Sequence, residues 1–154
     1  MRLTPPLQSH LLTMMDWFAD AQQVSDWAGP GVRFPYDLAS FTADLQLETL
    51  SSYVLLSDDN DLLGFGQYYK RLNRCHLGRL VISPDKRGTG MAAVLIKALC
   101  SKGLGEIGTT ELSLFVLAHN TSGIKAYQKF GFALASYPEQ MPLENCLYMV
   151  KSNQ

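Results

Sequence analysis

The sequence predicts a single α/β domain with a mixed sheet, and two observations support that prediction. Segments with the pattern of strands and segments with helical spacing follow one another in the order β-α-α-β-β-β-α-β-α-β-β. The 154 residues are 47% hydrophobic, which is enough at this length for one ample core. We therefore expect one domain that spans residues 1–154, without a linker or an internal repeat.

The N-terminal half is expected to hold an edge strand, two helices and a hairpin. The first strand, over residues 2–7, contains two prolines, which limit it to a sheet edge because proline cannot donate to a ladder. A helical pattern over residues 9–24 ends at a run of glycines and prolines. Asp37 is a suitable N-cap for a second helix. Two strands, over 52–56 and 62–69, flank a turn and form the hairpin.

In the C-terminal half, the sequence predicts a strand, a glycine-rich turn, and further strands and helices. A strand over 75–83 leads into a helix that starts at Met91, and Gly103 is expected to end that helix. The apolar strand over 111–118 is typical of one that is buried on both faces. Asn120 is a suitable N-cap for the last helix, which two closing strands follow.

Composition and charge exclude several classes of partner. The formal net charge is −1 with interspersed acids and bases, so we expect no nucleic acid partner. Without a long apolar run or a signal peptide, we expect no membrane partner and a cytoplasmic location. The cysteines, Cys75, Cys100 and Cys146, lack metal-ligand spacing, so we expect reduced thiols and no metal.

The segment Arg87-Gly88-Thr89-Gly90-Met91-Ala92 connects the end of a strand to the start of a helix. The first turn of a helix leaves about four backbone N–H groups without intrahelical partners. Small residues allow a bulky anion to approach them, and the helix dipole and Arg87 add positive charge. The segment therefore suits a pyrophosphate, and an ordinary βα turn is the alternative.

Two known phosphate motifs fit this segment poorly. The P-loop requires Gly-Lys-Ser/Thr after its glycines, which is missing here. Gly88-x-Gly90-x-x-Ala93 has the letters of the dinucleotide fingerprint, with Glu106 and Glu111 near its acidic position. That fingerprint should open a doubly wound sheet early in the domain, whereas here it lies past the middle.

Arg87-x-x-Gly90-x-Ala92 resembles the diphosphate signature Gln/Arg-x-x-Gly-x-Gly/Ala of the GNAT superfamily of acyl-CoA N-acyltransferases. A second segment, from Asn120 through Tyr127 to Gly131-Phe132, is similar to that family's Asn…Tyr-x-x-x-Gly-Phe segment. The resemblance covers residues 76–132. It implies a mostly antiparallel sheet of about six to seven strands flanked by about four helices, and transfer of an acetyl group from acetyl-CoA to a primary amine in a ternary complex.

The resemblance also implies roles for individual residues. The strand residues Leu80, Val81 and Ile82 would bind the pantetheine arm and polarise the thioester through the backbone of a bulge, and Asn120 would contact the same arm. Tyr127 occupies the family's usual general-acid position, with a packed helix tyrosine as the alternative. The diphosphate of acetyl-CoA would bind at Arg87, Gly88, Thr89, Gly90, Met91, Ala92 and Ala93.

His76 is the candidate general base, because it stands eight residues before Pro84, where the family often has a glutamate. A neutral imidazole can accept a proton near pH 7, and a strand-edge histidine without a chemical role is the alternative. Strand alternation predicts that His76, Gly78, Leu80 and Ile82 share one face, although a bulge would reverse that alternation.

The acceptor site is expected in the N-terminal half, with Asp37 or Asp44 meeting a cation and with Trp27, Arg33, Phe34 and Tyr36 forming its wall. The acceptor stays open between a small amine, an amino acid, an antibiotic and a protein amine, and a homodimer is compatible with the sequence. Two other functions stay open: a non-catalytic acyl-CoA-binding module and a dinucleotide-dependent enzyme.

Overall fold

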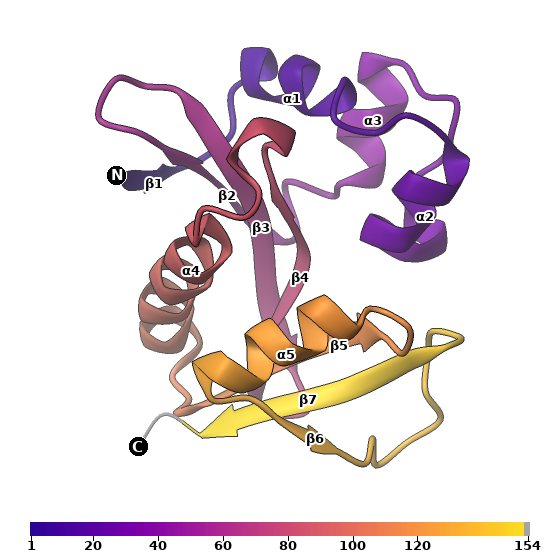
Figure 1. Cartoon of the computed structure of the whole chain (residues 1–154), viewed down its shortest axis with the longest axis vertical. Helices are drawn as coiled ribbons and strands as arrows, with labels where there is room; N and C mark the ends of the chain where they lie inside the picture. Colours follow the sequence, from indigo (N-terminus) through magenta and orange to yellow (C-terminus); the bar gives the residue numbers. More distant parts are fainter. Residues whose placement is uncertain (153–154) are drawn as a thin grey trace.

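The structure is a computed structural model that describes residues 1–152, and it confirms a mixed α/β fold (Figure 1). One sheet has the strand order β1-β2-β3-β4-β5-β7-β6. Neighbouring strands are antiparallel except β4 and β5, which are parallel because a helix connects them. The strands are β1 (Arg2–Thr4), β2 (Ser51–Leu56), β3 (Leu62–Arg71), β4 (Arg74–Ile82), β5 (Glu111–Leu117), β6 (Ala133–Ala135) and β7 (Cys146–Ser152).

Residues 1–152 contain five α-helices, where the sequence predicted about four. The helical pattern over residues 9–24 divides in two, because the side chain of Asp20 accepts a hydrogen bond from the backbone N–H of Gln23 and starts a new helix. The α-helices are α1 (Gln8–Met15), α2 (Ala21–Ala28), α3 (Leu38–Asp44), α4 (Met91–Ile107) and α5 (Thr121–Phe130), with short 3₁₀ turns η1 (Gly29–Gly31) and η2 (Pro84–Lys86).

The prediction that Gly103 ends its helix is wrong. Helix α4 continues to Ile107, and Gly108 ends it with a left-handed φ of 77°. Gly103 serves close packing instead, because a Cβ at this position would lie 2.6 Å from Sγ of Cys75 and 3.2 Å from the ring of Tyr68.

Two apolar cores lie on opposite faces of the sheet. Helices α1, α2 and α3 pack on one face against Val54, Phe65 and Val81. Helices α4 and α5 pack on the other face, where Leu77 and Leu112 belong to the larger core. Figure 1 shows α1, α2 and α3 together at the top and right of the view, on one side of β3 and β4. We call the face that they partly cover the front face.

Strand β4 parts from β5 after a short paired stretch. The two strands pair only at Cys75–Leu77 with Leu112–Leu114, although β4 continues to Ile82 and β5 to Leu117. At the point of parting, β4 carries a bulge, because Gly66 faces two residues of β4, and one of them, Arg79, has a φ of 49°. The part of β4 beyond the bulge therefore pairs with β3 alone.

Within residues 1–152, no helix is both long and apolar enough to cross a bilayer. Cys75 and Cys100 are buried free thiols, and burial raises their pKa to about 11 and about 12.

Candidate active site

The glycine-rich turn before α4 leaves the start of that helix open. Gly88 and Gly90 have left-handed φ values of 77° and 81°, and Gly90 is the N-cap, which has no side chain to offer. A Cβ at either glycine would meet no heavy atom of residues 1–152 within 4 Å. The first N–H groups of α4 are thus accessible to a bulky anion, as the pyrophosphate interpretation requires.

The remaining residues of this turn support the same arrangement. Nε of Arg87 donates to the backbone carbonyl of Ile82 at 3.3 Å, which ties the guanidinium to the end of β4. The hydroxyl of Thr89 donates to the backbone carbonyl of Lys86 and turns away from the helix start. Met91 is half-buried, whereas Ala92 and Ala93 are exposed on the first turn of α4. The exposed surface at this end of the helix is therefore mostly backbone and methyl groups.

A cavity of about 90 Å³ borders Ala92 on the first turn of α4 and the part of β4 that is not paired with β5. It joins three elements that are distant in the sequence: the end of β4, the first two turns of α4, and the middle of α5. Its apolar lining suits an uncharged, flexible chain. The lining residues are Leu80, Val81, Ile82, Ala92, Leu95, Ile96 and Tyr127.

Tyr127 lies near the residues at the end of β4 that the family resemblance also implies in acetyl-CoA binding. It lines the same cavity as Leu80, Val81 and Ile82, and its ring packs edge-on against Phe132 at 6.1 Å between centroids. Burial raises the pKa of Tyr127, so the phenol stays protonated at neutral pH. The role of Tyr127 as a proton donor to a ligand in this cavity stays a prediction.

Asn120 stands at the mouth of a second, larger cavity of about 300 Å³. Its side chain caps α5 by accepting from the N–H of Gly123 at 3.0 Å, which confirms the capping role. The cavity also borders Asp26 of α2 and His119, which sequence reasoning left without a role. Contact of Asn120 with a pantetheine arm stays a prediction.

The bulge in β4 is held in place by a tryptophan from α2. Nε1 of Trp27 donates to the backbone carbonyl of Arg79 at 2.9 Å, and the Trp27 ring stacks on Phe18 with centroids 4.5 Å apart. Trp27 was expected to wall the acceptor site, and its hydrogen bond gives it a further positioning role. Sequence reasoning did not single out Arg79, because nothing local marks a bulge residue.

The expected facing of β4 is wrong. Leu77, Leu80 and Ile82 belong to the core under α4, whereas Val81 packs against the front-face helices. The bulge at Arg79 inserts one residue and reverses the alternation. His76 therefore does not share a face with Leu80 and Ile82.

His76 lies in the part of β4 that is paired on both sides. It is 2% exposed, its Nδ1 lies 2.8 Å from Oγ of Ser113, and its ring packs between Tyr69 and Phe115. Burial, aided by the charge of Arg71, lowers the pKa of His76 to about 3. A base role for His76 stays a prediction, and these surroundings favour a packing role, because the imidazole resists protonation.

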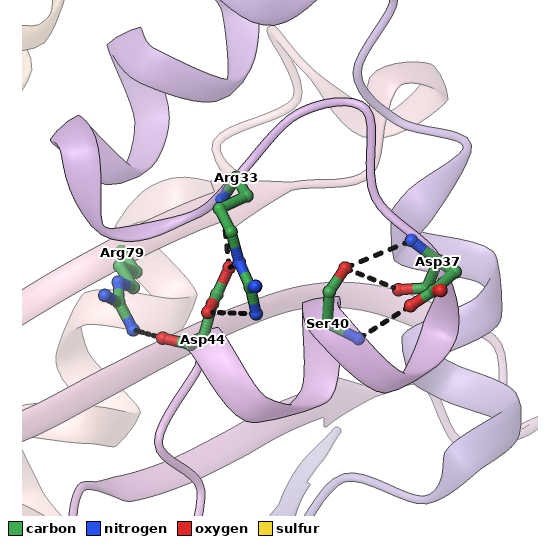
Figure 2. Close-up of polar contacts among 5 residues, drawn as sticks. All are labelled: Arg33, Asp37, Ser40, Asp44 and Arg79. Atoms are coloured by element: carbon green, nitrogen blue, oxygen red, sulfur yellow. Dashed lines mark hydrogen bonds and ion pairs between the residues drawn. The ribbon is translucent and has the colours of Figure 1, made fainter.

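The two carboxylates proposed to meet a cationic acceptor have other partners (Figure 2). Asp37 caps α3 by accepting from the N–H of Ser40 at 2.8 Å. The carboxylate of Asp44 binds Nε of Arg33 at 3.0 Å and also accepts from the Arg33 backbone N–H. Neither acid is placed as a free anchor for a positively charged acceptor, so that expectation is not supported.

A comparison with protein families matches residues 12–132 to the acetyltransferase (GNAT) family. The chain belongs to the GNAT family of acetyltransferases. Among residues 1–152, no group of three or more His, Cys, Asp or Glu side chains is placed to bind a metal ion.

Solved GNAT structures share the complete fold with this acetyltransferase at low sequence identity. A structure of AAC(6')-Ib with paromomycin and acetyl-CoA has a TM-score of 0.78 at 19% identity, covering 99% of this chain and 93% of that chain. The ribosomal-protein-S18-alanine N-acetyltransferase from Escherichia coli has a TM-score of 0.66 at 20% identity, covering 99% of this chain and 93% of that chain. A spermidine N-acetyltransferase SpeG chimera from Vibrio cholerae and hSSAT has a TM-score of 0.74 at 13% identity, covering 99% of this chain and 96% of that chain.

Proposed function

We propose that this acetyltransferase transfers the acetyl group of acetyl-CoA to a primary amine by direct attack in a ternary complex. The observation that supports this most strongly is the continuity of the open helix start with the apolar cavity beside β4. An anion fits the first site and an uncharged thioester-bearing arm fits the second. The structures of AAC(6')-Ib with acetyl-CoA or coenzyme A have the same fold.

The reaction places demands that the residues around the cavity meet. The amine nitrogen attacks the thioester carbonyl carbon, and negative charge develops on the carbonyl oxygen. Backbone N–H groups of Leu80–Ile82 would stabilise that charge, because this part of β4 is not paired with β5. The carbon–sulfur bond then breaks, and the leaving thiolate takes the proton of Tyr127.

The attacking amine must also lose a proton, and several features bear on that step. His76 is buried with a lowered pKa, so it is poorly suited to accept the proton. An amine that arrives neutral and releases its proton to bulk water after the attack needs no buried base.

Thermal unfolding with separate additions of acetyl-CoA, coenzyme A and NADH tests the cofactor. A ligand at one hundred times its Kd stabilises the folded state by about 2.7 kcal/mol, which moves Tm by several degrees. Acetyl-CoA and coenzyme A should raise Tm, and NADH should not. A shift with NADH alone would overturn the proposal in favour of a dinucleotide enzyme.

Release of free coenzyme A in the presence of an amine panel then tests the transfer. Amine-dependent release supports the proposed reaction. Binding of acetyl-CoA without release from any amine would point to the non-catalytic acyl-CoA-binding module instead.

A further inference from the structure

The front face carries two arginines that have only neutral partners. Arg79 at the bulge donates from Nη1 to the backbone carbonyl of Asp44 at 3.0 Å and to Oε1 of Gln67 at 3.3 Å. Figure 2 shows this guanidinium against the carbonyl of Asp44, whose carboxylate is occupied by Arg33. Within residues 1–152, no carboxylate lies within ion-pairing distance of Arg79.

Burial makes this lack of a carboxylate partner costly for Arg79. The guanidinium is partly buried, and desolvation lowers the pKa of Arg79, although an arginine remains charged at any physiological pH. A buried charge is usually paired with an opposite charge, because neutral hydrogen-bond acceptors compensate only part of the lost hydration. A carboxylate is the group that best complements such a guanidinium, through paired N–H···O hydrogen bonds.

Arg71 presents a second positive charge on the same face. Its Nε donates to the hydroxyl of Tyr69 at 3.2 Å, and its Nη1 donates to the hydroxyl of Tyr137 at 2.9 Å. The guanidinium also lies 5.2 Å from the ring centroid of Phe115. Because both phenols accept from Arg71, their own O–H groups are free to donate to an anion. Arg74, by contrast, pairs with Glu111 at 3.5 Å.

Gly78 leaves space between these two arginines. A Cβ at this position would approach only the ring of Tyr69, at 3.9 Å, within the described residues. Tyr69 therefore lies beside Gly78, where its hydroxyl accepts a hydrogen bond from Arg71. A small molecule above Gly78 would meet donors from both sides and would lie next to the bulge.

We propose that the acceptor is an amino-acid-like amine whose own carboxylate binds Arg79, with Arg71 and the Tyr69 hydroxyl completing the anion site. This inference rests on the proposed function, since the carboxylate would hold the amine beside the thioester at the bulge. Aminoglycosides and spermidine, which are named in the related structures, carry several positive charges, and this face would repel them. The front face instead selects a molecule with one amine and one carboxylate.

Matched acceptors test the inference with the intact enzyme. The panel pairs glycine, β-alanine, leucine, phenylalanine and glutamate with their carboxamides, and adds spermidine and kanamycin. Rates are compared per neutral amine, since amidation changes the basicity of the nitrogen. We expect kcat/KM for the carboxylate of at least one pair to exceed that of its carboxamide by about ten- to a hundredfold, because the carboxamide leaves Arg79 unpaired.

Two variants and one control locate the effect. Arg79→Gln should raise KM for the carboxylate acceptor about tenfold or more and should reduce the preference for the carboxylate over its carboxamide, while the acetyl-CoA shift in Tm is retained. Arg71→Gln should also raise KM for the carboxylate acceptor. The Arg71 side chain contacts mainly phenols and aromatic rings. This second variant therefore tests the inference even if Arg79→Gln fails to fold. Lys70→Gln removes one exposed positive charge from the adjacent β3 position and should change none of these values.

The outcomes separate this inference from the proposed function. Equal use of carboxylates and carboxamides, or preference for spermidine or kanamycin, would overturn the inference and leave acetyl transfer intact. If acetyl-CoA binds but no amine reacts, carboxylate amines must still raise the Tm of the coenzyme A complex, and failure to do so overturns the inference. Absence of any acetyl-CoA shift would overturn the proposed function itself.

Discussion

The two halves of strand β4 differ in what surrounds their backbone. Residues 75–77 are paired with β3 on one side and β5 on the other, and they bury Cys75, His76 and Leu77. Residues 78–82 pair with β3 alone and carry the bulge, and the last three of them, Leu80, Val81 and Ile82, line the cavity that Tyr127 also borders. Backbone groups that are already paired cannot bind a substrate, so the half without a β5 partner is the one suited to chemistry.

This contrast predicts that changes near the open half affect ligand binding and rate, whereas changes in the paired half affect stability. Four substitutions test it, and they are taken from the largest expected effect to the smallest.

Gly90→Val should abolish the acetyl-CoA shift in Tm. A β-branched residue disfavours the left-handed φ of 81° and places methyl groups in the space that a diphosphate would use. Gly108→Val is the matched control, because Gly108 has a φ of 77° at the other end of α4 and equally open surroundings within the described chain. If both variants lose stability alike and both keep the shift, the anion does not bind at this turn.

Tyr127→Phe should lower kcat by roughly a hundredfold and leave the affinity for acetyl-CoA nearly unchanged. The substitution removes only the hydroxyl that would protonate the thiolate. Tyr53→Phe serves as the control, because its hydroxyl lies 3.5 Å from Glu106, near the far end of α4. Unchanged kcat together with lowered stability would instead assign Tyr127 to packing.

Gly78→Ala should raise KM for the acceptor about tenfold while KM for acetyl-CoA and Tm change little. The new methyl group makes ordinary contact with Tyr69 and projects into the space above the strand. Steady-state kinetics with the preferred amine measures the effect. Gly105→Ala, at an exposed position of α4, is the control. An acceptor KM equal to that of the native enzyme would place the amine elsewhere.

His76→Gln should change the pH dependence of stability more than it changes the rate. The folded-state pKa of about 3 lies below the ordinary 6.5, so the unfolded chain binds the proton first. Stability from this group is complete above pH 6.5 and is lost as pH falls, by up to about 1.4 kcal/mol per pH unit for one proton.

Urea unfolding at several pH values between 5 and 7 measures how steeply the free energy of unfolding changes with pH. This window lies above the pH range in which the carboxylates titrate. The slope should be shallower in His76→Gln, and His119→Gln is the control substitution at an exposed histidine. His10 has a lowered pKa and contributes to the same window, so both variants are compared with the native chain. A loss of two or more powers of ten in kcat at neutral pH would restore His76 as the base.

The sequence by itself determined the local features of this acetyltransferase from which we propose an acetyl-CoA site. Positive φ at Gly88 and Gly90, the cap at Asn120 and the helix that carries Tyr127 follow from local backbone preferences, so short motifs reveal them. The strand and helix order also follows from local periodicity, apart from the extra helix that Asp20 starts and the length of α4 beyond Gly103.

Only the tertiary structure decided the arrangement of the front face, where we propose that the acceptor binds. The bulge at Arg79 depends on pairing with β3 and on a hydrogen bond from Trp27, 52 positions away, and it reversed the predicted facing of His76. The neutral partners of Arg71 and Arg79 come from β3, α3 and the segment before β7. Such contacts depend on how distant segments meet, and no local preference of the chain encodes them.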